Sequence, residues 1–470
     1  MTAVVTDNLK HSILKTLLAD YNSSSSEFYI GLSRSEYWDS NDVAINPVNS
    51  KHDIVDFKSR LQAVKQVEAA SFVVPRQDWT YGVIYPQWDD RRSGTLSLSR
   101  RYYVLTDNYG VYICLRTGKN KAGVTQPSLV KPSLANIDPF ETSDGYVWKF
   151  LYTVSALKAN YFLSSQYMPV HRQETAPDSN STGIEIKQWE IQSNAVPGRI
   201  TSFAMTNEGS GYGTAGQFPT ISVVGNGALR FPGAGDSANL VLSSVIDSDT
   251  GRITAIKTDP IGTTLNYLDS YTVATITLAG GGGDSAQARP IIGPTPGFGF
   301  DPVVDLKADA LMFRSKILET DNDFILSQDF RQIGLIKDPL AGDSAGRYRA
   351  LTGIATHHMK LSQKTVPFSK DKVIEGVSSG AKGYIDNFDS SIALGARIFY
   401  HQSPETGFRD FLANETIQEI DGNGEGTIGD SANVPGEVDK FSGDVLYLDN
   451  RSAVQRTSNQ SEDIKVIIQL

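Results

Sequence analysis

The chain has 470 residues, more than one ordinary hydrophobic core organises, so several domains are expected. Hydrophobic residues make up 40% and charged residues 20% of it, which is typical of a globular protein and excludes wholesale disorder. The formal net charge is −10, and an acidic surface repels phosphate, so nucleic-acid binding is disfavoured as the main function. The basic pairs at 91–92 and 100–101 are better explained by a solvated loop.

Cysteine content and hydropathy indicate where the protein is found. The single cysteine, Cys114, excludes an internal disulfide and lies in an apolar run, 111–115, that predicts a buried strand. No stretch approaches the roughly 20 apolar residues of a membrane helix. The first ten residues lack the pattern of a signal peptide. We therefore expect a protein made and kept in a cytosol-like compartment.

The first part of the chain combines helices with strands. Helical spacing of apolar residues predicts a helix over 7–21 and a second over 52–70. The expected buried faces are Leu9, Ile13, Leu14, Leu17 and Leu18 in the first helix, and Ile54, Phe57, Leu61, Val64 and Val67 in the second. A short strand is predicted at 28–32. Strands are also predicted at 101–105 and 110–116, joined as a hairpin, and at 146–154.

Residues 184–300 are rich in Gly, Ser and Thr and contain an internal repeat. The tetrapeptide Gly-Arg-Ile-Thr occurs at 198–201 and 251–254, and Gly-Asp-Ser-Ala at 235–238 and 283–286. The same order and similar spacing suggest two copies of one small β unit. Two copies are too few for a solenoid, so a compact inserted β domain is expected.

The rest of the chain predicts further strands. Residues 301–340 return to long apolar runs, and 341–435 form a second turn-rich module with strands at 372–377, 383–388 and 396–400. Strands at 444–448 and 464–470 close the chain. The apolar run at 466–468 would promote aggregation if unpaired, so we expect it to pair inside the protein or across a dimer.

These elements predict a mainly β fold with a few helices, of the α+β class. A β-sandwich-like core is expected to consist of 1–183, 301–340 and 436–470. The regions 184–300 and 341–435 are then two small β modules inserted into this core.

The common catalytic and metal-binding signatures are mostly missing from the sequence. It has no phosphate-binding loop, no His-Glu-x-x-His and no Cys-x-x-Cys. His357 and His358 are adjacent, which turns the rings apart and makes a poor metal pair. We therefore expect no enzyme, no cofactor and no metal site.

Three glycine-rich motifs are better explained as turns. Gly-Val-Ser-Ser-Gly at 376–380 fits a nucleophile elbow, but a β-like run follows it where the elbow needs a helix. The loop at 421–426 resembles a calcium loop, but its twelfth position is Ala432, which has no carboxylate. Gly-Asp-Ser-Ala recurs at 342–345 and 429–432, where Asp and Ser favour turns.

Five segments taken in order resemble a known family. They are 29–38 (YIGLSRSEYW), 73–79 (VVPRQDW), 144–152 (DGYVWKFLY), 330–333 with 338–340 (FRQI and DPL), and 443–451 (GDVLYLDNR). In this order they are similar to the baseplate wedge subunit encoded by gene eight in T-even-type contractile-tailed phages. The similarity covers roughly residues 10–175, 301–340 and 440–470, and the chain is longer than the family core.

The resemblance implies a structural virion protein of the tail baseplate, made late and assembled in the host cytoplasm. It implies a homodimer that contacts other wedge subunits, resembling the products of genes six, seven and ten. Tryptophans beside cations also have the composition of interface hot spots, although the same residues could fill the core. The candidate interface or core residues are Arg34, Trp38, Arg76, Trp79, Trp148 and Arg331.

The alternative is a tail-associated carbohydrate-binding or carbohydrate-active β-rich protein. Such a protein would need exposed aromatic residues or a pair of catalytic carboxylates, and no particular pair is indicated. Within 184–300, the strongest aromatic candidates are Tyr212, Tyr267 and Tyr271.

Overall fold

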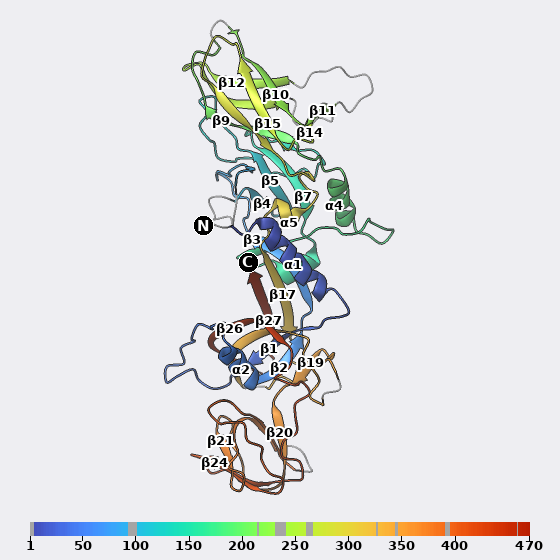
Figure 1. Ribbon diagram of the computed structural model, residues 1–470, viewed down its shortest axis with the longest axis vertical. Coiled ribbons are helices and arrows are strands. Elements are labelled where there is room, and N and C mark those ends of the chain that lie inside the picture. The colour runs from blue at the N-terminus through green and yellow to red at the C-terminus, as the bar shows by residue number, and fades with distance from the viewer. Residues whose placement is uncertain are drawn as a thin grey trace. The chain divides into compact units, whose positions relative to one another are not determined.

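The protein is mainly β, with several antiparallel sheets and, among the residues that the structure describes, five helices, which confirms the predicted class (Figure 1). The computed structural model describes residues 4–92, 101–213, 216–230, 241–259, 267–325, 328–343, 346–390, 395–457 and 459–470. The chain divides into two compact units. Unit 1 comprises Met1–Leu14, Ser71–Leu311 and Gln469–Leu470, and unit 2 comprises Lys15–Ala70 and Met312–Ile468. The segments predicted to form one core therefore contribute to both units.

An antiparallel four-stranded sheet organises the first half of unit 1. Its order is β4 (Tyr103–Leu105), β5 (Gly110–Arg116), β7 (Val147–Thr153) and β6 (Phe140–Glu141). β4 and β5 form the predicted hairpin, whose turn places Tyr109 in the left-handed region at φ 62°. Cys114 is buried on β5 as predicted, and burial raises the pKa of its thiol.

Aromatic side chains fill the core beneath this sheet. Trp148 is fully buried, stacks on Tyr146 and meets Tyr85 edge-on, with ring centroids 5.7 Å apart in both pairs. Ile191 of α4 (Gly183–Ser193) joins the same cluster. The predicted boundary at 184 therefore falls within a helix that contributes to this core.

Shorter elements flank the sheet. β3 (Ala69–Pro75) pairs antiparallel with β8 (Tyr167–Val170). The helices α3 (Ala156–Phe162) and α4 each begin with a side-chain cap. Ser155 caps α3, and Thr182 and Glu185 form a capping box at the start of α4. α5 (Pro302–Asp305) is a single turn.

The repeat region of unit 1 folds as two interlocked copies. The first copy contributes β9 (Ile200–Asn207), β10 (Thr220–Gly225) and β12 (Val241–Asp247), and the second contributes β13 (Arg252–Asp259), β15 (Ala274–Ala279) and β16 (Gln287–Ile292). β9 pairs with β16, β10 with β15 and β12 with β13, all antiparallel. The first strand of each copy thus pairs with the last strand of the other. Two short strands, β11 (Ala228–Arg230) and β14 (Tyr267–Asp269), also pair.

The glycine that opens each Gly-Arg-Ile-Thr copy is required by its backbone. Gly198 and Gly251 both have positive φ, and a Cβ on Gly198 would lie 2.2 Å from the carbonyl oxygen of Tyr271. The second recurring tetrapeptide precedes β16, where Ser285 also has positive φ. Its other copy, 235–238, and residues 344–345 lie outside the described residues.

Unit 2 contains a five-stranded antiparallel sheet. Its order is β19 (Thr352–Ile354), β2 (Leu61–Gln66), β1 (Phe28–Ser33), β18 (Asp329–Lys337) and β26 (Asp444–Gln455). α2 (Lys51–Ser59), capped by Ser50, packs Phe57 against the sheet, where Gly31 and Gly334 leave room for its ring. β1 confirms the strand predicted at 28–32.

The helix predicted over 52–70 is wrong beyond Ser59, where the chain turns into β2. Its apolar residues recur at helical spacing, but polar positions between them are buried too. Gln62 donates to the carbonyl of Asp329 at 2.9 Å, and Lys65 pairs with Asp321 at 2.9 Å. Because β2 is buried on both faces, its apolar residues do not alternate with exposed ones, and their spacing can be mistaken for that of a helix.

The helix predicted over 7–21 is present as α1 (Asp7–Tyr21), but its predicted buried face is partly wrong. His11 and Leu14 are buried, whereas Leu9 and Ile13 are exposed. Near the helix end, Tyr21 meets the rings of Phe28 and Phe313 edge-on. The buried face is therefore rotated away from Leu9 and Ile13.

The terminal strand pairs within the chain, one of the two arrangements expected from sequence. β27 (Glu462–Gln469) lies beside β17 (Ala310–Ile317). Arg314 of β17 pairs with Asp463 of β27 at 2.7 Å and with Glu68 at 2.6 Å. Val466 is buried, which uses part of the apolar run at 466–468.

Part of the region 341–435 forms a closed barrel in unit 2. Its order is β20 (His357–Val366), β23 (Arg397–His401), β22 (Lys382–Asp389), β21 (Val373–Gly376), β24 (Thr416–Ile420) and β25 (Glu425–Ile428), and β25 pairs back to β20. Alternating inward side chains such as Met359, Ile385 and Ile417 form its core. Because β19 belongs to the five-stranded sheet, the barrel begins after Ile354.

A candidate protein interaction surface

Three of the five family-like segments lie on adjacent strands of unit 2. Segment 29–38 begins on β1, segment 330–333 lies on β18, and segment 443–451 lies on β26. β1 pairs with β18 and β18 with β26, so residues far apart in sequence meet on one sheet. The chain between β1 and α2 forms a loop over residues 35–49, called the 35–49 loop below.

Arg331 fixes the 35–49 loop to the sheet. Its side chain is almost fully buried on β18, and its Nε and Nη2 donate to the two carboxylate oxygens of Asp42 at 2.7 and 2.9 Å. It also donates to the carbonyl of Ser35 and pairs with Asp329 at 3.2 Å. The hydrogen bond from Arg331 holds the pKa of Asp42 below its ordinary value.

Two cation–aromatic contacts order the start of the loop. The guanidinium of Arg34 lies 4.3 Å from the ring centre of Trp38, and that of Arg331 lies 4.7 Å from the ring centre of Tyr37. Arg34, at φ 62°, also pairs with Asp56 at 3.3 Å. The predicted residues Arg34, Trp38 and Arg331 therefore belong to one cluster.

The loop presents apolar side chains to solvent. Tyr37 is 67% exposed, and Val43, Ile45 and Val48 are similarly exposed. Isolated exposed hydrophobic residues are common, but four in twelve residues on an ion-anchored loop form a local apolar surface. The charged contacts of Arg331 with Asp42 fix the loop where it passes over the sheet.

The loop also lies along β26, an edge strand of its sheet among the described strands. The indole nitrogen of Trp38 donates to the carbonyl of Arg451 at 3.0 Å, and Asn450 donates to the carbonyl of Ile45 at 2.8 Å. An uncovered edge strand is a template for unwanted pairing. The loop therefore occupies polar groups of β26.

A buried ionic network joins the loop to the barrel. The His401 ring is fully buried, with Nδ1 2.8 Å from Asp386 and Nε2 2.8 Å from Glu36. Burial disfavours the imidazolium, but the two carboxylates outweigh it and raise the pKa of His401 to about 9. Arg60 pairs with Glu36 at 3.1 Å and with Glu405. The network thus links the segment after β1 with strands β22 and β23.

Sequence reasoning missed this network. Glu36 lies within the family-like segment 29–38, but His401, Asp386 and Arg60 are far from it in sequence, and isolated charged residues give no signal of a shared site. The one available hint is His401, which directly follows the strand predicted at 396–400, and a lone histidine is by itself uninformative.

The other predicted residues lie in unit 1 and do not join this surface. Trp148 is fully buried in the hydrophobic core of unit 1. Trp79 is partly buried against the same core, and its indole donates to Ser128 at 3.1 Å. Arg76 pairs with Asp78 at 2.9 Å and donates to the carbonyl of Ser164 at 3.0 Å. These contacts are local to unit 1.

Two of the three glycine-rich motifs, 376–380 and 421–426, are turns, as expected. Residues 376–380 connect β21 to β22, and Ser379 binds the carboxylate of Glu415 through its amide at 2.9 Å and its hydroxyl at 2.8 Å. Residues 421–426 connect β24 to β25, with Gly424 donating to Glu419 at 3.0 Å.

His357 and His358 face different aromatic rings, Tyr400 and Phe399. Within the described residues, no group of three or more His, Cys, Asp or Glu side chains is placed to hold a metal ion.

Two of the three aromatic candidates for sugar stacking are not available as surfaces. Tyr212 and Tyr271 are buried in the core of the repeat region, and the side chain of Tyr267 lies outside the described residues. This burial removes two of the three residues on which the carbohydrate alternative depended.

Comparisons with known protein families and with curated proteins found no match. In the described part of the chain, no helix is long and apolar enough to cross a membrane.

Proposed function

We propose that this protein is a structural subunit of a phage tail baseplate wedge, which assembles by protein–protein contacts and carries out no catalysis. Support comes from the five family-like segments and from where three of them fall. These three lie on adjacent strands, and the first of them runs into the 35–49 loop as far as Trp38. We infer that this loop is the surface that a partner contacts. The observation that carries the proposal is this loop with exposed apolar side chains, anchored to the sheet by the buried Arg331.

The loop has the features of an interface centre. Tyr37 supplies aromatic area at low entropic cost, and Arg331 beneath it supplies a fixed cation. A stable interface buries roughly 800 Å² on each partner, so the loop would be the centre of a larger contact. A second exposed apolar stripe, Leu9 and Ile13 on α1, is available for another contact.

The proposed partners are a second copy of the chain and other wedge subunits, resembling the products of genes six, seven and ten. The proposed location is the virion tail baseplate, reached after assembly in the host cytoplasm. An assembly subunit with several neighbours needs several separate surfaces, and the loop and the α1 stripe are two such surfaces.

Co-expression with the wedge subunits of the same genome tests the proposal. Light scattering of the purified chain should report a dimer, and tagged chain should co-purify those subunits in fixed ratio. The chain should show no turnover of polysaccharide, peptidoglycan or ester substrates. A strict monomer that co-purifies none of them, or turnover abolished by one Asp, Glu or Ser substitution, would contradict the proposal.

A further inference from the structure

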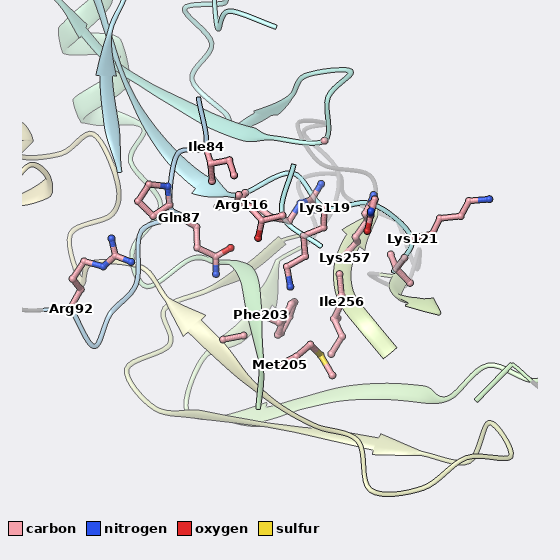
Figure 2. A pocket seen from close by; sticks show the side chains of 18 residues that line it. Ile84, Gln87, Arg92, Arg116, Lys119, Lys121, Phe203, Met205, Ile256 and Lys257 are labelled. Atoms are coloured by element: carbon pink, nitrogen blue, oxygen red, sulfur yellow. The ribbon is translucent and has the colours of Figure 1, made fainter. Parts of the chain in front are cut away.

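Unit 1 contains a pocket between the repeat region and its neighbouring segments. It encloses about 540 Å³ and is lined by residues of 84–92 and 116–125 on one side and of β9, β12 and β13 on the other. Figure 2 shows Lys119 extending toward Phe203 and Met205, with Ile256 on the same wall. The volume is within the range of small-molecule sites, roughly 300–1,000 Å³.

The charge of the pocket is opposite to that of the protein. Five of its lining residues are cations and none of the described lining residues is acidic, although the chain carries a net charge of −10. The cations are Arg92, Arg116, Lys119, Lys121 and Lys257. Five cations without an acidic residue in the described lining create a local positive potential, which attracts anions.

Arg116 is the most buried of these cations, and one of its nitrogens is available to donate a hydrogen bond. Its side chain is more than nine-tenths buried, and its Nη1 has no hydrogen-bond partner among the described residues. Its Nη2 lies 2.7 Å from Glu141, which also lies 3.7 Å from Lys257. A buried guanidinium with an unpaired nitrogen is costly unless an anion binds it.

The remaining lining residues restrict the body of the ligand. Gln87, Thr117, Asn120 and Thr125 offer hydrogen bonds to hydroxyl groups, whereas Phe203 and Met205 offer an apolar wall. Inorganic phosphate would leave most of the volume and the apolar wall unused. A ligand with a charged head and a hydroxyl-bearing body would use all three kinds of lining.

We propose that this pocket binds a small organic anion, a phosphate or carboxylate group carried on a hydroxyl-bearing body of about sugar size. The anion lies against Arg116, Lys119 and Lys257, and the body lies against the polar and apolar walls. This site is independent of the 35–49 loop and of the proposed assembly function.

Isothermal titration calorimetry on the full chain tests the site with four probes. Glucose 6-phosphate and glucuronate should bind, and glucose and inorganic phosphate should bind at least tenfold more weakly. Binding should weaken as salt rises, because exposed charges are screened. Inorganic phosphate binding as tightly as glucose 6-phosphate, or neither organic anion binding at millimolar concentration, would overturn the proposal.

Matched variants locate the binding. Lys257 and Lys382 are both 41% exposed at the side chain and lie 3.7 and 3.6 Å from a glutamate, but only Lys257 lines the pocket. K257Q should weaken binding several-fold and K382Q should leave it unchanged. E141Q should strengthen binding, because it frees Arg116 and Lys257 from their carboxylate. Equal losses in the two lysine variants, or weaker binding in E141Q, would place the ligand elsewhere.

Discussion

Two tryptophan motifs with the same composition have different roles in this molecule. In unit 2, Trp38 lies half-buried under the guanidinium of Arg34, at the base of an exposed loop. In unit 1, Trp148 is fully buried between Tyr85 and Tyr146, while its neighbour Lys149 reaches the carbonyl of Ile137. The two motifs therefore differ in the partner of the cation, because Arg34 pairs with the carboxylate of Asp56 whereas Lys149 donates to a backbone carbonyl.

The largest expected effect is on the core tryptophan. W148A should lower the free energy of unfolding by about 3–5 kcal/mol, because it leaves a large cavity in a packed aromatic cluster. W38A should cost only about 1–2 kcal/mol, the value of one cation–π contact and one hydrogen bond. Denaturant unfolding followed by circular dichroism measures both. Equal losses would show that the two sites do not differ as described.

The next effect concerns the anchor of the 35–49 loop. R331M should cost about 2–3 kcal/mol, below the usual value for breaking a buried pair because Asp42 and Asp329 are partly exposed. R451M is the control, because Arg451 pairs with Asp449 at the surface, and it should cost less than about 0.5 kcal/mol.

A double variant tests the ion pair itself. D42N should cost less in the R331M background than alone, since the partner charge is already gone. Strictly additive losses in the unfolding free energies would mean that Arg331 stabilises the loop by other contacts.

The buried ionic network around His401 predicts that the free energy of unfolding of the protein depends on pH. The pKa of His401 is raised from 6.5 to about 9, so the folded state holds its proton more tightly than the unfolded state. The resulting stabilisation of the folded state, on the order of 3 kcal/mol, is fully present below pH 6.5 and is lost as pH rises through about 9. Unfolding free energies of the natural chain and H401Q, measured from pH 6 to 10, should converge at the alkaline end. A constant difference across this range would contradict the assignment.

The smallest expected effect is from removing the repeat region. Its ends lie together, because Gly198 donates to the carbonyl of Pro294 at 2.9 Å and Gly293 to that of Arg199 at 3.0 Å. Replacing 199–293 with a short Gly/Ser linker should leave the rest of unit 1 folded, since loop closure across adjacent ends is inexpensive. Starting the deletion at 184 should be more damaging, because it removes Ile191 from the core. Loss of cooperative unfolding in the shorter deletion would show that the repeat region is part of the main core.

Sequence patterns predicted the local elements well and the long-range contacts poorly. The mainly β class, the range of α1, the β4–β5 hairpin and three of the barrel strands, β21, β22 and β23, follow from periodicity and turn residues. The boundary after Ser59 does not, because Gln62 and Lys65 are polar yet buried by partners distant in sequence. Likewise Arg34, Trp38 and Arg331 could be selected as candidates, but only strand pairing brings Arg331 to Asp42 and His401 to Glu36.

The most direct test of the central claim measures partner affinity in a loop variant against a matched control. Tyr37 and Tyr81 are 67% and 68% exposed, but only Tyr37 lies on the 35–49 loop. Y37A combined with V43S should lower the unfolding free energy by no more than about 1 kcal/mol, the value of one exposed cation–π contact. The same variant should weaken binding to the co-expressed wedge subunits by about tenfold or more, as expected for an interface anchor, while Y81A binds normally. Unchanged binding in the loop variant, or an equal loss in Y81A, would contradict the assignment of this loop as the assembly surface.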